Sequence, residues 1–247
     1  MVREAFNSGG VLNFIEKKHL QNFTNNDVKV FKFAKQIVEQ IPLGISKIFP
    51  NMNQAFFYEN DLKRIQRSDL EGMPTLIALS FYGNLISHIP EDIFFDLKLL
   101  KSVSISYNTL QSLPDHIFQN QLDLRRVYLN SNFLIALQPE VFENNDKLEV
   151  VFLQNNLLAR IAPFGENLPI TSIDLRNNYC ADHQISHQSE IKNLNDILVN
   201  RCKESSKDVT KHVEMCAEEL NYCKMEEVAA QNKNKIIKNE KKRALIL

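Results

Sequence analysis

The sequence is poor in glycine and lacks the motifs that many enzyme sites need. Glycine supplies only 6 of the 247 residues, which argues against a nucleotide site built from backbone loops. No Gly-rich phosphate loop, GxSxG motif or HExxH motif occurs, so the sequence assigns no catalytic residue, cofactor or metal. We therefore expect a protein that is not an enzyme.

Long hydrophobic runs and an excess of one charge are also missing. No apolar run approaches the roughly 18 residues of a transmembrane helix, so we expect no membrane span. The first twenty residues lack the apolar stretch of a signal peptide, so the chain taken literally starts in the cytosol. The formal net charge is -1, which gives no general attraction to nucleic acid or to anionic membranes.

A repeat of about 24 residues is the main positive signal. Apolar residues stand eight, five and three places before each of a series of asparagines, as Leu100, Val103 and Ile105 do before Asn108. This LxxLxLxxN spacing is typical of leucine-rich repeats. An earlier stretch fits the register with Gln36 in the asparagine place, so we predict about seven turns, the first and last atypical. The repeated asparagines are Asn60, Asn84, Asn108, Asn132, Asn156 and Asn178.

Stacking of the turns explains each position of the repeat. The apolar residues before the asparagine lie on a short strand, and strands of successive turns pair in parallel about 4.8 Å apart. The side-chain amide of each asparagine can hydrogen-bond backbone groups of the turn that would otherwise be buried without a partner. Because the asparagine recurs in successive turns, we predict that these amides stack into a ladder. Phe94, Phe118 and Phe142 fill the wide convex side. The sequence thus predicts an α/β-type solenoid: a leucine-rich repeat horseshoe with a parallel concave sheet, a helical C-terminal cap and a helical tail.

The cysteines mark the end of the repeats. None precedes Cys180, which stands two residues after Asn178, where earlier turns have an apolar residue. A Cys180–Cys202 disulfide would tie the amphipathic stretch between them over the open end of the core. Four reduced thiols are the alternative, because four cysteines alone do not establish an oxidising compartment. We divide the chain into an N-terminal flank (1–25), the repeats (26–179), a cap (180–204) and a tail (205–247).

A zinc site is a weaker alternative use of the same cysteines. Cys180, His183 and His187 are close in sequence, with Cys202 as a fourth ligand, and histidines four residues apart share one face of a helix. Because the disulfide already accounts for both cysteines, we predict no metal site.

The tail carries a short coiled-coil pattern. Val209, Val213, Cys216, Leu220 and Cys223 follow alternating steps of four and three residues, before a basic end. On one helix Cys216 and Cys223 would be about 10.5 Å apart, too far to bridge each other. They could link two chains into a homo- or heterodimer. The alternative is an amphipathic helix folded back on the cap, with both cysteines as small apolar residues.

The entry into the repeats resembles a known family. Residues 25–90, with DVK, IPLGI, FPN and DL motifs before the regular repeats, are similar to secreted leucine-rich repeat proteins of mosquitoes and midges. The array, followed by Cys180 and a helical tail, resembles mosquito leucine-rich repeat immune proteins, which circulate in haemolymph and pair through cysteines and coiled coils. The resemblance covers residues 25–182 and implies secretion. Because such proteins carry a signal peptide and usually N-terminal cysteines, it also implies a truncated or mis-started N-terminus.

The outward positions of the strands predict the binding surface. Residues four and two places before each asparagine point onto the concave face. Aromatic side chains gather there, and tyrosine is enriched in protein-binding surfaces; the alternative is that β-propensity alone favours them. A serine cluster (Ser80, Ser102, Ser104, Ser106) between the rings would leave a shallow place for a partner. The predicted partner-binding residues are Phe56, Tyr58, Tyr82, Ser104, Ser106, Tyr107, Tyr128, Asn130, Phe152, Gln154, Asp174 and Arg176.

Two functional classes follow from these observations. The first is an extracellular recognition module that binds a protein or glycan partner on its concave face and acts in innate immunity, as the resemblance implies. Asn22, in an Asn-Phe-Thr sequon, would then be the candidate glycosylation site. The second is an intracellular scaffold or enzyme regulator that uses the same face with reduced cysteines. The fold does not choose the ligand, since one solenoid hosts many functions.

Overall fold

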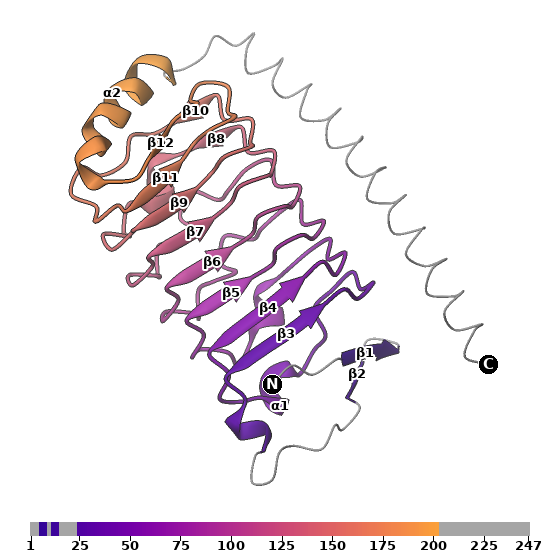
Figure 1. Cartoon of the computed structure of the whole chain (residues 1–247). Coiled ribbons are helices and arrows are strands. Elements are labelled where there is room, and N and C mark those ends of the chain that lie inside the picture. Colours follow the sequence, from indigo (N-terminus) through magenta and orange to yellow (C-terminus); the bar gives the residue numbers. More distant parts are fainter. Residues whose placement is uncertain (1–4, 9–10, 15–23, 203–247) are drawn as a thin grey trace.

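A sheet of short strands runs the length of the repeats (Figure 1). The computed structural model describes residues 5–8, 11–14 and 24–202. The main sheet has eight strands in the order β12-β11-β9-β7-β6-β5-β4-β3, and every pairing in it is parallel except that of β12 with β11. The strands are β3 (Val30–Ala34), β4 (Gln54–Tyr58), β5 (Ala78–Ser80), β6 (Ser102–Ser104), β7 (Arg126–Tyr128), β9 (Val150–Phe152), β11 (Ser172–Asp174) and β12 (Gln184–Ile185).

Adjacent strands pair with an offset of one repeat. Val103 pairs with Val127, and Val127 pairs with Val151, so residues 24 apart (127 − 103) stand side by side. The last step is shorter, because Val151 pairs with Ile173. The seven parallel strands enclose six full turns. The predicted fold class, a leucine-rich repeat horseshoe, is confirmed for the described residues, and the predicted helical tail lies outside them.

Short elements complete the turns between the strands. β8 (Ala136–Leu137) and β10 (Arg160–Ile161) form a small parallel sheet, whereas β1 (Ala5–Ser8) and β2 (Val11–Phe14) pair antiparallel. The short helical elements are η1 (Asn25–Asp27), α1 (Ile45–Ile48), η2 (Arg67–Leu70), η3 (Pro139–Phe142) and η4 (Gln188–Glu190).

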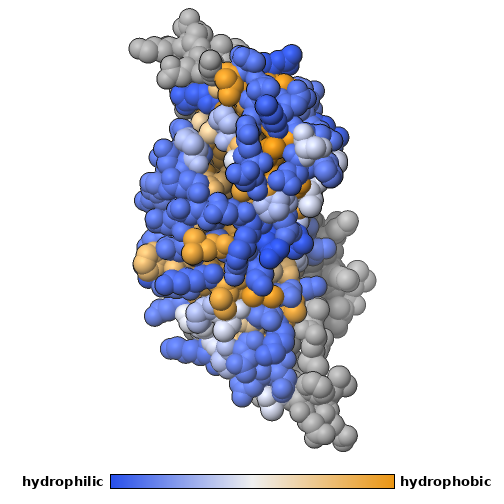
Figure 2. Space-filling model, turned by 90° about the vertical axis from the view of Figure 1, so that its left-hand side faces the viewer, coloured by the Kyte–Doolittle hydropathy of each residue, from blue (hydrophilic) through white to orange (hydrophobic). Residues whose placement is uncertain are grey.

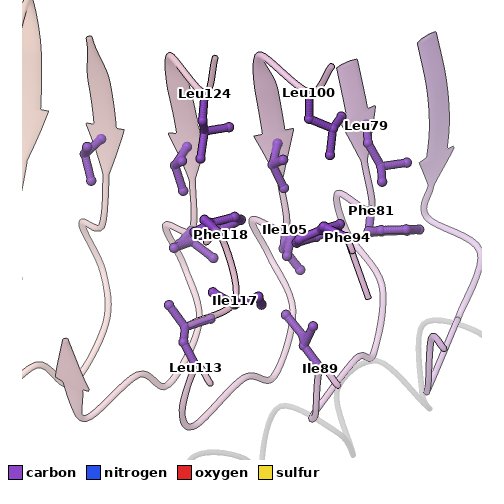
Figure 3. Packing of buried hydrophobic residues seen from close by; sticks show 14 of the residues in the cluster. Leu79, Phe81, Ile89, Phe94, Leu100, Ile105, Leu113, Ile117, Phe118 and Leu124 are labelled. Atoms are coloured by element: carbon purple, nitrogen blue, oxygen red, sulfur yellow. The ribbon is translucent and has the colours of Figure 1, made fainter. Parts of the chain in front are cut away.

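The inward positions of the repeat form one continuous core. Leu100, Val103 and Ile105 are fully buried, and the same positions of the neighbouring turns stack on them (Figure 3). On the convex side, the ring centroids of Phe94 and Phe118 are 5.6 Å apart, and the planes of the two rings are nearly parallel. Because each turn is covered only by its neighbours, this core is stable only as an array.

The repeated asparagines join successive turns through buried hydrogen bonds. The Nδ2 of Asn132 donates to the carbonyl oxygens of Leu129 and Ile105, both at 3.0 Å, and its Oδ1 accepts from the backbone N–H of Leu110 at 3.1 Å. Each rung therefore satisfies backbone groups of two turns where a strand ends. Cross-turn bonds of the same kind recur at Asn60, Asn84, Asn108, Asn156 and Asn178.

A second, shorter amide ladder lies beside the convex phenylalanines. The Nε2 of Gln121 donates to the carbonyl of Phe94 at 2.7 Å, and the Nδ2 of Asn145 donates to the carbonyls of Phe118 at 3.1 Å and Gln121 at 3.0 Å. Both amide side chains are almost completely buried. Sequence analysis missed this ladder, although Gln121 and Asn145 are also 24 residues apart (145 − 121).

Replacing Asn145 by alanine should lower the free energy of unfolding by about 1 kcal/mol, because the carbonyls of Phe118 and Gln121 each lose one donor but keep a backbone donor. Urea denaturation checks this value. The adjacent and exposed Asn144 is a matched control, since Asn144→Ala should change stability by less than about 0.5 kcal/mol. Equal effects of the two substitutions would contradict the second ladder.

Helix α2 (Ile191–Arg201) covers the last turn of the array (Figure 1). Its apolar side packs into the core. Asn195 holds it to the backbone of Phe164, because its Nδ2 donates to the Phe164 carbonyl at 2.7 Å and its Oδ1 accepts from the Phe164 N–H at 2.9 Å. A disulfide joins Cys180 to Cys202, the residue that ends the helix. Across the described ranges, no helix has the length and apolar character of a membrane span.

Candidate functional site

Four aromatic side chains form a continuous group on the concave face, here called the first aromatic group. The rings of Phe56 and Tyr58 are stacked with their centroids 5.5 Å apart. Tyr58 meets Tyr82 edge to face at 6.3 Å, and Tyr82 lies 5.0 Å from Tyr107. These separations are those of favourable aromatic pairs. The group spans β4 and the ends of β5 and β6.

A hollow separates this group from a second aromatic group, in which Tyr128 and Phe152 meet edge to face at 5.4 Å. Between the groups, β6 carries only serine on this face, at Ser102 and Ser104. The hollow, here called the serine hollow, has a volume of about 270 Å³. No charged residue is among those that line it, which are Phe56, Tyr58, Ala78, Leu79, Ser80, Tyr82, Ser102, Ser104 and Tyr128.

The serines of the hollow differ in their hydrogen bonds. The Oγ of Ser80 accepts from the backbone N–H of Tyr82 at 3.3 Å and also hydrogen-bonds Tyr58. The hydroxyls of Ser102 and Ser104, in contrast, have no hydrogen-bond partner among the described residues. Two free hydroxyls therefore lie between two groups of rings.

Burial shifts the titration of two tyrosines beside the hollow. Desolvation raises the pKa of Tyr58, and the hydrogen bond from Ser80 offsets only part of this rise. Desolvation also raises the pKa of Tyr82, with smaller contributions from Tyr107 and Glu59. Both hydroxyls stay protonated at any physiological pH, so neither tyrosine brings a charge to this part of the concave face; a positive charge lies beside it, at the Nζ of Lys32, 5.9 Å from the centroid of the Phe56 ring.

The raised pKa of Tyr58 predicts a loss of stability in strong base. The folded state holds the proton more tightly than the unfolded state, whose tyrosine pKa is about 10. The stabilising contribution is thus complete below about pH 10 and is lost as the pH rises through the folded-state pKa. Urea denaturation between about pH 9 and about pH 11, a range centred on that value, measures this loss. As the pH rises, the free energy of unfolding of Tyr58→Phe should fall less than that of the unmodified protein. Identical pH profiles would contradict this assignment.

Two of the predicted contact residues are structural rather than accessible. Ser106 is only 3% exposed and donates to the Oδ1 of Asn130 at 2.6 Å. Asp174 is 2% exposed and binds Arg176 through two contacts of 3.0 Å and 2.7 Å. Its strand also pairs with β12 at Gln184, which closes the sheet. The prediction that Ser106 and Asp174 contact a partner is corrected, because both are covered.

The remaining predicted residues divide the face into an aromatic and a polar part. Asn130 and Gln154 are half-buried and lie two residues after Tyr128 and Phe152, in the turns of the second aromatic group, whereas Arg176 is exposed one turn nearer the cap. Tyr107 is 46% exposed and lies past the end of β6. Its backbone is left-handed, and this conformation recurs at the residue before each ladder position, with φ between 51° and 69°, at Lys35, Glu59, Gly83, Tyr107, Ser131, Asn155 and Asn177.

The alternative zinc site does not form. Cys180 and Cys202 are bonded to each other, and Nδ1 of His187 accepts from the backbone N–H of Ser189 at 3.2 Å. In the part of the chain that the structure describes, no three His, Cys, Asp or Glu side chains gather as metal ligands would. The candidate glycosylation site Asn22 and the candidate interchain cysteines Cys216 and Cys223 lie outside the described residues.

Exposed apolar side chains also occur away from the strands, and sequence analysis missed them. Phe95, Leu99 and Leu122 are largely exposed on the segments that lead into β6 and β7. The Phe95 ring lies 4.4 Å from the guanidinium carbon of Arg67, which also pairs with Asp96 at 2.8 Å. Figure 2 shows hydrophobic side chains midway along one side of the molecule and others towards its upper end, among hydrophilic ones. Scattered exposed apolar residues are normal and need no function.

Comparison with known proteins agrees with this architecture. Residues 98–158 match a family model described as leucine rich repeat. No curated protein matches the chain. The chain therefore contains a leucine-rich repeat domain, a fold whose concave surfaces are used for binding.

Many solved structures are similar to this chain, and two of them illustrate the likeness. One is the leucine-rich repeat domain of APL1, at 17% identity and a TM-score of 0.56, covering 72% of this chain and 53% of that one. The other is InlP of Listeria monocytogenes, at 29% identity and a TM-score of 0.51, covering 62% of this chain and 43% of that one. The chain thus spans about half of these relatives or less. At 17% identity, the likeness to APL1 shows the fold alone.

Proposed function

We propose that this chain is a non-enzymatic recognition module that binds a protein partner through the aromatic part of its concave face. The observation that carries the proposal is the pair of aromatic groups on either side of the serine hollow. Tyrosine combines a large contact area with a polar tip and few rotors, and it is enriched where proteins bind each other. Tyr82 and Tyr107 keep about 36% and 46% of their surfaces exposed, so both rings can be covered by a partner.

An extracellular setting and a role in innate immunity are the finer parts of the proposal. The Cys180–Cys202 disulfide supports secretion, because disulfides persist in oxidising compartments. The resemblance of residues 25–182 to secreted dipteran proteins supports the immune role. Oligomerisation through Cys216 or Cys223 is proposed on the sequence pattern alone.

Photo-crosslinking tests the binding face. A photoreactive phenylalanine analogue replaces Tyr82, and the control carries it at the exposed Leu122, away from the concave sheet. Irradiation in fluid from the native source should give a specific protein adduct at position 82 that excess unlabelled chain removes, and none at position 122. The adduct partner, identified by mass spectrometry and purified, then serves in binding assays. Adducts at position 122 and none at position 82 would show that the concave face is not the binding surface.

The double substitution Tyr58→Ala and Tyr82→Ala should weaken binding of that purified partner at least about 100-fold, as expected for two central aromatic anchors. Both rings sit on the sheet surface, so the circular dichroism spectrum should not change. Isothermal calorimetry measures the affinity, and Asn144→Ala serves as the folded control. Unchanged affinity would show that the aromatic groups are not the contact surface.

Peptide mass spectrometry tests the cellular setting. Protein from the native source is alkylated before reduction, so that free thiols and disulfides are read together with the natural N-terminus. A Cys180–Cys202 peptide and an interchain link at Cys216 or Cys223 would support an extracellular, assembling protein. Four alkylated thiols would favour the intracellular scaffold instead.

A further inference from the structure

The aromatic column along the sheet has a gap at the serine hollow. The residues four places before the ladder asparagines are Phe56, Ser80, Ser104, Tyr128, Phe152 and, in the last turn, Asp174. Strands in a sheet are about 4.8 Å apart, so Phe56 and Tyr128 start roughly 14 Å apart on strands β4 and β7. Favourable ring centroids are about 4.5–7 Å apart. The two serines therefore leave room for a further ring between the aromatic groups.

The chemistry of the lining selects an uncharged occupant. No acidic or basic side chain lines the hollow, so a carboxylate or ammonium group buried in it would have no counter-charge among the lining residues and would lose its hydration. The faces and edges of Phe56, Tyr58, Tyr82 and Tyr128 instead offer contacts to another aromatic ring.

The two free hydroxyls refine this choice. Ser102 and Ser104 can each donate to and accept from a polar tip, as a phenol carries and a phenylalanine ring does not. A sugar ring fits less well, because it carries hydroxyls on all sides and two serines would leave several of them buried without partners.

We propose that the serine hollow is a binding pocket for one aromatic side chain of the protein partner, and that it prefers tyrosine to phenylalanine. The inserted ring closes the gap between the first and second aromatic groups, and its hydroxyl bonds Ser102 or Ser104. This inference rests on the proposed function, since it names the partner's side chain at the same face.

Small-molecule titration of the full chain tests the pocket. p-Cresol represents a tyrosine side chain, toluene represents phenylalanine, and methyl glucoside represents a sugar. The signals of ring-labelled Tyr58, Tyr82 and Tyr128 are followed by NMR and assigned with single Tyr→Phe variants. We expect p-cresol to shift these three signals with a millimolar dissociation constant and to bind more tightly than toluene.

Filling the gap supplies the matched variant. Ser104→Phe places a ring where Phe56 and Phe152 already stand in other turns, so the sheet should accept it, and it should weaken p-cresol binding at least about tenfold. Ser172→Phe makes the same change on β11 of the same sheet, outside the hollow, and should leave binding unchanged. If Ser104→Phe melts early, Ser102→Val takes its place as the variant expected to weaken p-cresol binding. The sheet already carries valine at the equivalent position of other turns, at Val30 and Val150.

The outcomes separate this inference from the proposed function. Absence of p-cresol shifts, or equal binding by Ser104→Phe and the unmodified chain, would overturn the pocket. If methyl glucoside shifted the same signals and bound more tightly than p-cresol, the ligand of the hollow would be a sugar and not an aromatic side chain. If the pocket fails while crosslinking at position 82 still yields a specific partner, protein recognition stands and only the inserted ring is rejected.

Discussion

Leu129→Asn should lower the free energy of unfolding by about 4–5 kcal/mol, the largest effect expected from a single substitution in this chain. Leu129 is fully buried in the middle of the array. Asparagine at this position removes most of an apolar side chain from the core. It also buries a new amide, and the backbone groups near it already have hydrogen-bond partners. The carbonyl oxygen of Leu129, for example, already accepts hydrogen bonds from the Nδ2 of both Asn132 and Asn156. Urea denaturation gives the loss, and amide hydrogen exchange should show that the turns next to β7 open first.

The preceding residue provides the control for Leu129. Tyr128 lies on the opposite face of β7, where it is only partly buried, so Tyr128→Asn should cost far less than Leu129→Asn. If Tyr128→Asn proved equally destabilising, the rings of the concave face would belong to the core. The assignment of inward and outward positions would then be wrong, and the proposed binding surface with it.

Removal of the Cys180–Cys202 disulfide should cost about 3 kcal/mol, the value expected for a loop of this size. The two cysteines are 22 residues apart in sequence. In Cys180→Ser with Cys202→Ser, we expect α2 to separate from the last turn before the rest of the array unfolds. Hydrogen exchange of the amides in Ile191–Arg201 should accelerate accordingly.

Two comparisons separate the disulfide from a general effect of cysteine loss. Cys216→Ser with Cys223→Ser makes the same chemical change elsewhere and should leave hydrogen exchange in α2 unaltered. A reducing agent should reproduce the effect in the unmodified protein and have none in the Cys180/Cys202 variant. Unchanged exchange in α2 after loss of the disulfide would mean that Asn195 and the apolar side of the helix hold the cap without it.

The repeat could be predicted from the sequence because a constant spacing of residues sets how each strand aligns with the next. A 24-residue spacing of Leu100, Val103, Ile105 and Asn108 with their equivalents aligns each strand with the next. Parallel stacking then requires the apolar positions to face inward and the asparagines to serve backbone groups at the strand ends. Residue type and spacing were sufficient for this step.

The candidate site was predictable only in part. Sequence alternation correctly brought Phe56, Tyr58, Tyr82, Tyr128 and Phe152 to one face. It also assigned Ser106 and Asp174 to that surface. Both side chains are covered, Ser106 beside Asn130 of the next turn and Asp174 beside Arg176 and strand β12. A residue's exposure depends on its neighbours across the sheet, and strand alternation does not include them.

The sequence by itself determined the solenoid, its register and its apolar interior, because a repeated pattern that cannot bury its core in one turn must stack on its copies. Tertiary structure alone decided which outward residues remain accessible, where the second amide ladder runs, and how Asn195 clamps the cap to Phe164. The serine cluster had already predicted a shallow place between the rings, and the structure added its lining and its volume, which depend on small side chains of β5 and β6 lying between large ones of β4 and β7. Such features arise from contacts between turns, so they depend on which side chains meet across the stack.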